Sequence, residues 1–146
     1  MDSKAVSTQQ IISTANTKFN DIKSLNNQFL GFVSNTLLTI KNPITLSILG
    51  QSLIVDFFDI KAKAYPRFVL AGINPPVFFV EYIFLNIDED KKEAGRFYLT
   101  DTGKLIEKLD NSASICDFND VNLTGNICRH ILVSAISESL IFKPTE

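Results

Sequence analysis

Residues 77–87 form a strongly apolar stretch that a single charge, Glu81, interrupts. Successive side chains of a β-strand point to opposite faces of its sheet, so a stretch that is apolar at both odd and even positions predicts a strand buried on both faces. We therefore expect this segment to be the central strand of a sheet that has a helix packed on each face.

The N-terminal part of the chain has a different pattern, because its apolar residues recur every three or four positions between residues 11 and 40. This spacing is typical of an amphipathic α-helix, with Ser7 or Thr8 as its N-terminal cap. Asn26 falls within the apolar stripe, so the segment fits either one long helix or two consecutive helices. Pro43 ends it in both cases, since proline disfavours a helical conformation in the residue before it.

Shorter apolar segments, separated by proline, glycine and charged residues, predict the other strands. Consecutive strands that are joined by short links pair in an antiparallel fashion. We expect an antiparallel meander of about four strands, formed by residues 58–64, 68–73, 77–87 and 96–100.

Three further segments are less regular. Residues 44–53 have Gly50 inside an apolar stretch, and we interpret them as a short helix or a turn in preference to a strand. Residues 105–109 fit either a strand or a helical turn. Residues 112–124 are rich in Ser, Asn and Asp, which predicts an irregular connection.

Helical spacing returns near the end of the chain, where Thr124 or Asn126 is the expected cap and Phe142 is the approximate end of the helix. The apolar stripe of this helix is expected to pack on the sheet. Its polar residues, among them His130 and Ser134, are expected to point away from the sheet.

These patterns predict a single α+β domain over residues 1–146, with a long N-terminal helix or helix pair, an antiparallel meander of about four strands and a C-terminal helix packed on the sheet. A chain of this length can bury the core of one domain. Its first residues lack the basic start and the apolar segment of a secretory signal, and prolines divide its most apolar regions. We therefore expect a cytoplasmic protein that does not enter a membrane.

The two halves of the chain differ in charge, since residues 1–67 carry a net charge of +3 and residues 68–146 one of −5. An acidic surface on the later part of the fold favours a basic protein as the partner. It disfavours nucleic acid, because phosphate binding needs basic side chains. The acids that we expect to contact the partner are Asp88, Glu89, Asp90, Glu93, Asp110, Asp117 and Asp120.

Few residues offer catalytic or metal-binding chemistry. His130 is the only histidine, and without a nucleophile motif or an orienting acid at a fixed offset we interpret it as a solvated or capping residue. Cys116 and Cys128 lack metal-ligand spacing and are expected to be free thiols. The sequence thus predicts neither a metal nor a cofactor, and it favours a protein that is not an enzyme.

Glu81 has two interpretations, because a carboxylate in so apolar a segment is costly to bury unless it is paired. The interpretation we favour is an ion pair with Arg67, Arg96 or Lys61. The alternative is an acid in an aromatic pocket, whose lining would be Tyr82, Phe57, Phe79 and Phe97.

The leading hypothesis for the function follows from the charge and from the lack of a catalytic motif. It is a non-catalytic protein-binding module, such as a bacterial immunity or antitoxin-like inhibitor that neutralises a basic, nuclease-type toxin. Such a protein is expected to be a monomer or a weak dimer. The alternative is a small-molecule-binding or enzymatic domain built around Glu81. A third hypothesis, a structural role through helix pairing, rests on the N-terminal apolar stripe alone.

Overall fold

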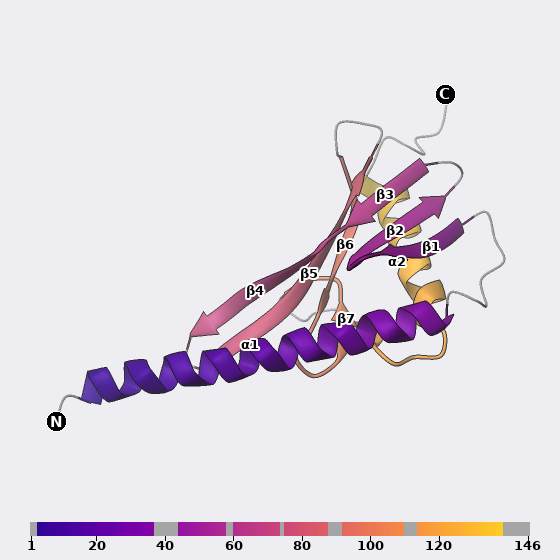
Figure 1. Ribbon diagram of the computed structural model, residues 1–146. Helices are drawn as coiled ribbons and strands as arrows, with labels where there is room; N and C mark the ends of the chain where they lie inside the picture. Colours follow the sequence, from indigo (N-terminus) through magenta and orange to yellow (C-terminus); the bar gives the residue numbers. More distant parts are fainter. Residues whose placement is uncertain are drawn as a thin grey trace.

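The N-terminal helix α1 (Ser3–Thr36) has 34 residues and lies along one side of a curled antiparallel sheet (Figure 1). The computed structural model describes residues 3–36, 44–57, 60–73, 75–87, 92–109 and 114–138. A second helix, α2 (Leu123–Glu138), packs on the sheet near the end of the chain. The strands are β1 (Ile44–Leu49), β2 (Ser52–Phe57), β3 (Ile60–Ala64), β4 (Pro66–Ile73), β5 (Pro76–Asn86), β6 (Glu93–Leu99), β7 (Lys104–Ile106) and β8 (Ser114–Asp117). The predicted α+β architecture is confirmed.

All strand pairs of the sheet are antiparallel, and their order is β1-β2-β3-β5-β6-β7-β8, with β4 also paired to β5. Strands β3 and β4 pair with different halves of β5, and β6 pairs with β5 along its other side. The prediction that residues 77–87 form the central strand is therefore confirmed. The described residues form eight strands, where about four were predicted.

The prediction of a short helix or turn at residues 44–53 is wrong, because this segment forms β1 and the start of β2. Its burial pattern changes from residue to residue along β1, as in a strand with one face on the core. Leu49 and Ser52 are paired across the turn, and Gly50 between them has a φ of 64°. Glycine adopts this conformation without strain, and two-residue hairpin turns require it. Gly50 thus closes a hairpin.

Two later segments are also strands. Residues 105–109, for which the sequence left a strand or a helical turn open, contain the end of β7, which pairs with β6. Residues 112–124, predicted to be irregular, contain β8. The polar composition of this segment does not indicate a strand. Strand β8 can be polar because it lies at the edge of the sheet, where only Ile115 and Cys116 are partly buried against the core.

Helix α1 is one continuous helix that begins at Ser3, before the predicted caps Ser7 and Thr8. Asn26 is buried, with 1% of its surface exposed, and it accepts a hydrogen bond from the hydroxyl of Tyr82. The polar residue in the apolar stripe is thus paired with the sheet and does not mark a break between two helices. The predicted end of the helix near residue 40 lies outside the described residues.

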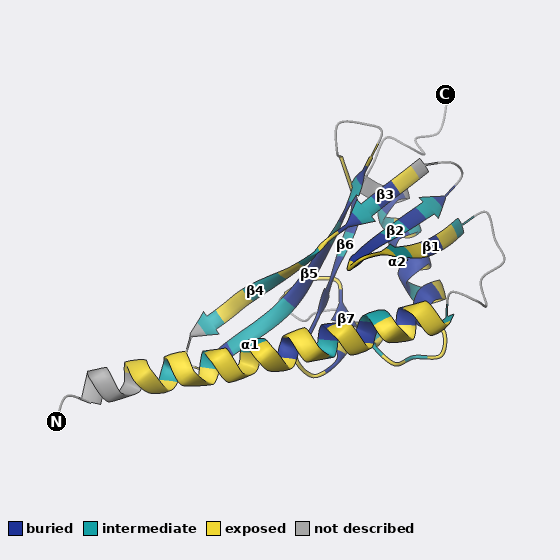
Figure 2. Ribbon diagram, viewed as in Figure 1, coloured by how far each residue is buried: buried dark blue, intermediate teal, exposed yellow. Residues whose placement is uncertain are grey.

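The buried positions of α1 lie in its second half, whereas its described N-terminal part is largely exposed (Figure 2). They recur at intervals of four, three and four residues, which is the spacing of one helical face. They are Ile22, Asn26, Phe29 and Val33.

Both helices pack on the same face of the sheet, which corrects the expectation of one helix on each face. The ring centre of Phe29 in α1 lies 5.6 Å from that of Tyr82 and 6.0 Å from that of Phe97. Ser134 of α2 lies over Gly95, so close that an added Cβ at Gly95 would be 3.0 Å from its side chain. Ser134 therefore faces the sheet, against the prediction.

The register of the sheet shows that these contacts fall on one face. Tyr82 is paired with Phe97, and Phe84 is paired with Gly95. Residues directly opposite each other in an antiparallel pair share a face, so the helices cover the face that carries these four residues. The other face of β5 is only half-buried at Phe79, Ile83 and Leu85.

Helix α2 begins at Leu123, so the predicted caps Thr124 and Asn126 lie inside it. Thr124 instead joins the two helices: its hydroxyl forms a hydrogen bond with that of Thr36 and lies 3.4 Å from the carbonyl oxygen of Val33. The helix is described as far as Glu138, and the predicted end near Phe142 lies outside the described residues. In the described part of the chain, neither helix is both long and apolar enough for a bilayer span.

We expect the replacement of Tyr82 by Phe to lower the free energy of unfolding by about 1 to 3 kcal/mol, because it leaves the buried amide of Asn26 without its partner. The double variant Tyr82→Phe, Asn26→Leu removes both polar groups and should cost less than the sum of the two single variants. Urea unfolding curves of the four proteins measure this difference. Additive losses would contradict a direct coupling between the two side chains.

Candidate functional site

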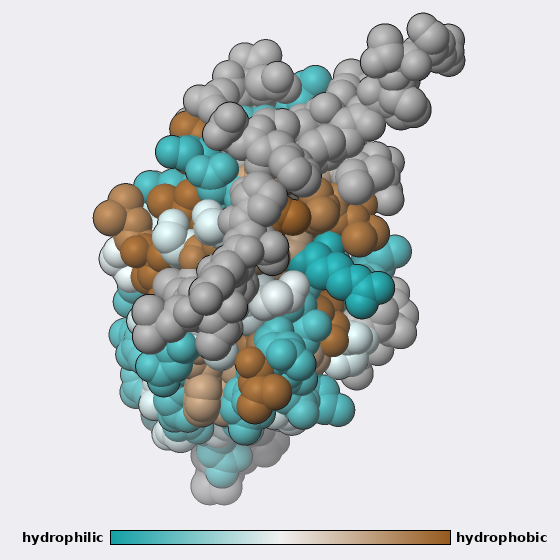
Figure 3. Space-filling model, turned by 90° about the vertical axis from the view of Figure 1, so that its right-hand side faces the viewer, coloured by the Kyte–Doolittle hydropathy of each residue, from teal (hydrophilic) through white to brown (hydrophobic). Residues whose placement is uncertain are grey.

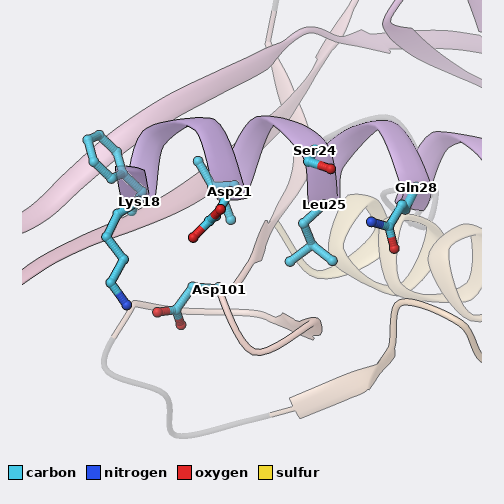
Figure 4. A pocket seen from close by; sticks show the side chains of 8 residues that line it. Lys18, Asp21, Ser24, Leu25, Gln28 and Asp101 are labelled. Carbon is cyan, nitrogen blue, oxygen red and sulfur yellow. The ribbon is translucent and has the colours of Figure 1, made fainter. Parts of the chain in front are cut away.

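A cleft of about 330 Å³ opens between α1 and the turn that joins β6 to β7 (Figure 4). The apolar side chains of Ile22, Leu25 and Phe78 form part of its wall. The polar residues that line it are Lys18, Asp21, Ser24, Gln28 and Asp101. Two carboxylates from separate parts of the chain, Asp21 and Asp101, thus face one space, with Lys18 beside them (Figure 4).

The turn that carries Asp101 is rigidly built. The backbone N–H of Thr100 donates to the carbonyl oxygen of Lys104 at 2.8 Å, and the hydroxyl of Thr100 accepts from the N–H of Lys104 at 3.1 Å. Gly103 has a φ of 85°, and an added Cβ there would lie 2.7 Å from the ring of Phe118. Only glycine fits both the conformation and the space at this position.

The link between β8 and α2 lies against the same turn. The N–H of Phe118 donates to the carbonyl oxygen of Gly103 at 2.8 Å, and Asp117 is paired with Lys104 across the β7–β8 ladder. The ring of Phe118 also contacts that of Phe32 in α1, with their centres 5.4 Å apart. We call the carboxylates at this place the acidic end: Asp21, Asp101, Asp117 and Asp120.

Of the acids predicted to contact a partner, the structure places Asp117 and Asp120 at the acidic end and Glu93 elsewhere. Glu93 begins β6 and the turn with Asp101 follows the end of β6, so the two lie ~20 Å apart along the strand. The carboxylate of Glu93 accepts two hydrogen bonds from Arg96, one of them 2.8 Å long at Nε. These bonds raise the pKa of Arg96 above its usual range. The remaining predicted acids lie outside the described residues: Asp88, Glu89, Asp90 and Asp110.

Asp21 and Asp101 are not among the site residues predicted from the sequence. Asp21 stands on the polar side of an amphipathic helix and Asp101 in a turn, and both positions are ordinary for a solvated acid. Only the packing of α1 across the sheet brings them together, and no spacing within the sequence reports that contact.

His130 does not point into solvent, although it was interpreted as a solvated or capping residue. Its side chain is 14% exposed, and its Nε2 lies 2.7 Å from the carbonyl oxygen of Arg96. Since a carbonyl oxygen only accepts, Nε2 donates this hydrogen bond. The ring lies beside a part of β6 that is not paired with β7, because β7 pairs only with Tyr98 and Leu99.

The second ring nitrogen of His130 lies 3.6 Å from Oε1 of Glu107. With Nε2 donating to the backbone, Nδ1 is the nitrogen left to accept a proton, and it faces the carboxylate of Glu107; no hydrogen bond joins the described side chains of His130 and Ser134. A cleft of about 520 Å³ runs past this group, and its lining includes Arg96, Lys108, Glu107 and His130.

The two cysteines are free thiols, as predicted. Burial raises the pKa of Cys128 to about 11, and burial together with the nearby charge of Asp120 raises that of Cys116 to about 11. Both thiols therefore stay protonated near neutral pH, and the thiol is a far weaker nucleophile and metal ligand than the thiolate. Among the described residues no three His, Cys, Asp or Glu side chains are grouped so that they could hold a metal ion.

Glu81 and the other four residues of the predicted aromatic pocket do not converge on one cavity. Tyr82, Phe57 and Phe97 are buried in the core beneath the helices. Glu81 is adjacent to Tyr82 in β5 and so lies on the opposite face, together with Phe79.

Glu81 instead forms the expected ion pair. Arg67 is directly opposite Glu81 in the β4–β5 ladder, and its Nη1 lies 3.7 Å from Oε1 of Glu81. The arginine side chain is 78% exposed, whereas that of Glu81 is 11% exposed, and Oε1 has no hydrogen-bond partner in the described structure. Of the three candidate partners of Glu81, the register of β4 against β5 therefore places Arg67 beside it.

Comparison of the chain with protein-family models, curated proteins and solved structures gives no match.

We expect the replacement of Gly103 by Ala to lower the free energy of unfolding by about 1 to 3 kcal/mol, because the new methyl group meets the ring of Phe118 in a backbone conformation that alanine avoids. Gly31→Ala is the control, since Gly31 lies in α1 with nothing within 4 Å of an added Cβ. That variant should gain up to ~1 kcal/mol from helix propensity. Thermal unfolding that is unchanged in Gly103→Ala would contradict the tight turn.

The raised thiol pKa values predict a loss of stability in alkali. Thiols of the unfolded chain ionise from about pH 9, while those of the folded protein keep their protons up to about pH 11. Their contribution to the free energy of unfolding is thus complete below pH 9 and is lost as the pH rises through 11. Unfolding of the wild type and of Cys116→Ala, Cys128→Ala should show the shallower pH dependence in the variant. Equal slopes would contradict the prediction.

Proposed function

We propose that this chain is a non-catalytic protein-binding module of the immunity or antitoxin type, which neutralises a basic, nuclease-type toxin in the cytoplasm of a bacterial cell. The observation that supports the proposal is the acidic end: Asp21 and Asp101 line one cleft, while Asp117 at the end of β8 and Asp120 in the β8–α2 link lie where that link is bonded to the turn of Asp101. The engaged ring of His130 and the protonated thiols fit a function without catalysis.

The chemistry of the acidic end suits a basic protein surface. Carboxylates accept charge-assisted hydrogen bonds from Arg and Lys, as the phosphates of a nucleic acid do. Asp21, Asp101 and Asp117 are exposed. Phe32, which is 38% exposed, contacts Phe118 next to Asp117 and is an apolar residue of the kind that anchors interfaces.

The rigidity of the acidic end supports tight binding. The turn with Asp101 is fixed by the bonds of Thr100 and by the contact of Gly103 with Phe118. Little conformational entropy is then lost on association, and binding energy is not spent on ordering a loop. Occupation of the toxin's basic cleft by these carboxylates would exclude its nucleic acid, and the opposite charges would speed the encounter.

The proposal predicts that removal of two exposed carboxylates weakens the complex. We expect Asp101→Asn, Asp117→Asn to bind the partner at least ~10-fold more weakly than the wild type in 0.15 M salt, since each lost charge pair at an interface is worth about 1 kcal/mol or more. The wild type and the variant, immobilised in parallel, serve to isolate basic proteins from the native cell. Each isolated protein is then purified and assayed for nuclease activity with and without this chain.

The control is Asp56→Asn, Glu93→Gln, which removes the same charge from β2 and from the far end of β6. Inhibition of a basic nuclease by the wild type and the control, but not by the test variant, supports the proposal. Equal inhibition by all three proteins contradicts the role of the acidic end. A wild type that binds such a nuclease and leaves it active contradicts the inhibitor function.

A further inference from the structure

The outer edge of β1 differs from the other exposed edges of the sheet. Strand β8, at the opposite end of the sheet, has four residues, ends at Asp117 and shifts its register against β7. Strand β4 begins with Pro66 and Arg67 and shifts its register before Gly72. Short length, proline, charge and bulges are the devices by which edge strands avoid pairing with another chain.

Strand β1 has none of these devices. Its six residues include no charge and no proline, and its register with β2 is continuous. Within the described residues β1 is paired on one side only, so a row of its backbone N–H and C=O groups faces away from the sheet. Figure 3 shows the right-hand side of the molecule as drawn in Figure 1, where apolar residues are scattered among polar ones.

The hairpin defines which backbone groups face outward. Leu49 and Ser52 flank the two-residue turn of Gly50 and Gln51. In such a hairpin the flanking pair exchanges both hydrogen bonds, and bonded pairs alternate with unbonded ones from there. The residues of β1 that bond to β2 are thus Thr45, Ser47 and Leu49. Those whose N–H and C=O groups face the open edge are Ile44, Leu46 and Ile48.

Strand β1 pairs with a second copy of itself most completely in one register. A two-fold axis at Leu46 places Leu46 of two copies opposite each other and Ile44 opposite Ile48. All the outward groups then pair, giving about six backbone hydrogen bonds. The core-facing side chains of these three residues form one continuous apolar row. A shift of one residue would place that row opposite the polar face of the other copy.

We propose that two copies of this chain associate through antiparallel pairing of their β1 strands, centred on Leu46, into one continuous sheet. A second copy fits this edge because two uncharged strands do not repel each other and because their apolar rows coincide. The acidic end lies on α1, β8 and two connections, so the inference does not depend on the proposed function. In the dimer each copy keeps its acidic end.

Cross-linking tests the register directly. In the proposed dimer, Thr45 of one copy is opposite Ser47 of the other, in an unbonded pair whose Cα atoms lie about 4.5 Å apart, within disulfide range. We expect an equimolar mixture of Thr45→Cys and Ser47→Cys to form a covalent dimer under mild oxidation. Each variant alone should form far less of it. The wild type, whose two thiols are protonated and partly buried, is the control.

The outcomes separate the alternatives. A covalent dimer of Ser47→Cys alone would place the two-fold axis at Ser47 and overturn the proposed register. No covalent dimer in any mixture would overturn the pairing itself.

Sedimentation equilibrium over a range of concentrations tests the association without oxidation. Thr45→Lys, Ser47→Lys places lysines opposite each other across the proposed junction, and we expect it to weaken the dimer about 10-fold or more. Asn27→Lys, Ser34→Lys adds the same charge at exposed positions of α1 and should leave the association unchanged. A wild type that is monomeric at every concentration overturns the proposal. If the wild type is monomeric and the β1 variant alone loses toxin binding, the edge of β1 binds the toxin and not a second copy of this chain.

Discussion

The contact of Phe29 with the stacked rings of Tyr82 and Phe97 is the interaction on which the rest of the structure depends. Helix α1 is rich in Ser, Thr and Asn, each about 0.5 kcal/mol less favourable in a helix than Ala. Burial of a single Phe contributes about 1.5 to 3 kcal/mol, and an aromatic pair about 0.5 to 1.5 kcal/mol more. The contact of Phe29 thus offsets the weak propensity of several of these residues, and the position of α1 that it fixes provides one wall of the cleft at the acidic end.

Periodicity alone was enough to predict the main elements. The stripe of α1 and the apolar stretch of β5 extend over many residues, so that a few exceptions did not obscure them. The prediction for the hairpin of β1 and β2 was wrong because Gly50 was interpreted as the interruption of a single apolar segment. The same glycine closes the two-residue turn between two strands. Strand β8 was missed because its pairing with β7, and not its composition, makes it a strand.

The candidate site was less predictable because it depends on contacts between distant parts of the chain. Composition identified acids in the later half of the chain, but the acid that lines the same cleft as Asp101 is Asp21, in the basic first half. His130 was misplaced for a related reason. A polar residue on an amphipathic helix usually faces water, but here the unpaired carbonyl of Arg96 offers it an acceptor at the sheet. Glu81 was interpreted more accurately because its partner, Arg67, belongs to a neighbouring strand whose register follows from a short turn.

The contacts that hold α1 have a consequence for synthesis of the chain. The bond between Asn26 and Tyr82 spans 56 residues of sequence, and that between Val33 and Thr124 spans 91. Because α1 is made before the sheet and its own propensity is weak, its apolar stripe has no surface to cover until β5 and β6 have been made. Contacts of such long range also slow folding. The packing of α1 therefore depends on elements that are made much later, and a chain released before α2 has been made lacks the contact of Thr124 with Val33.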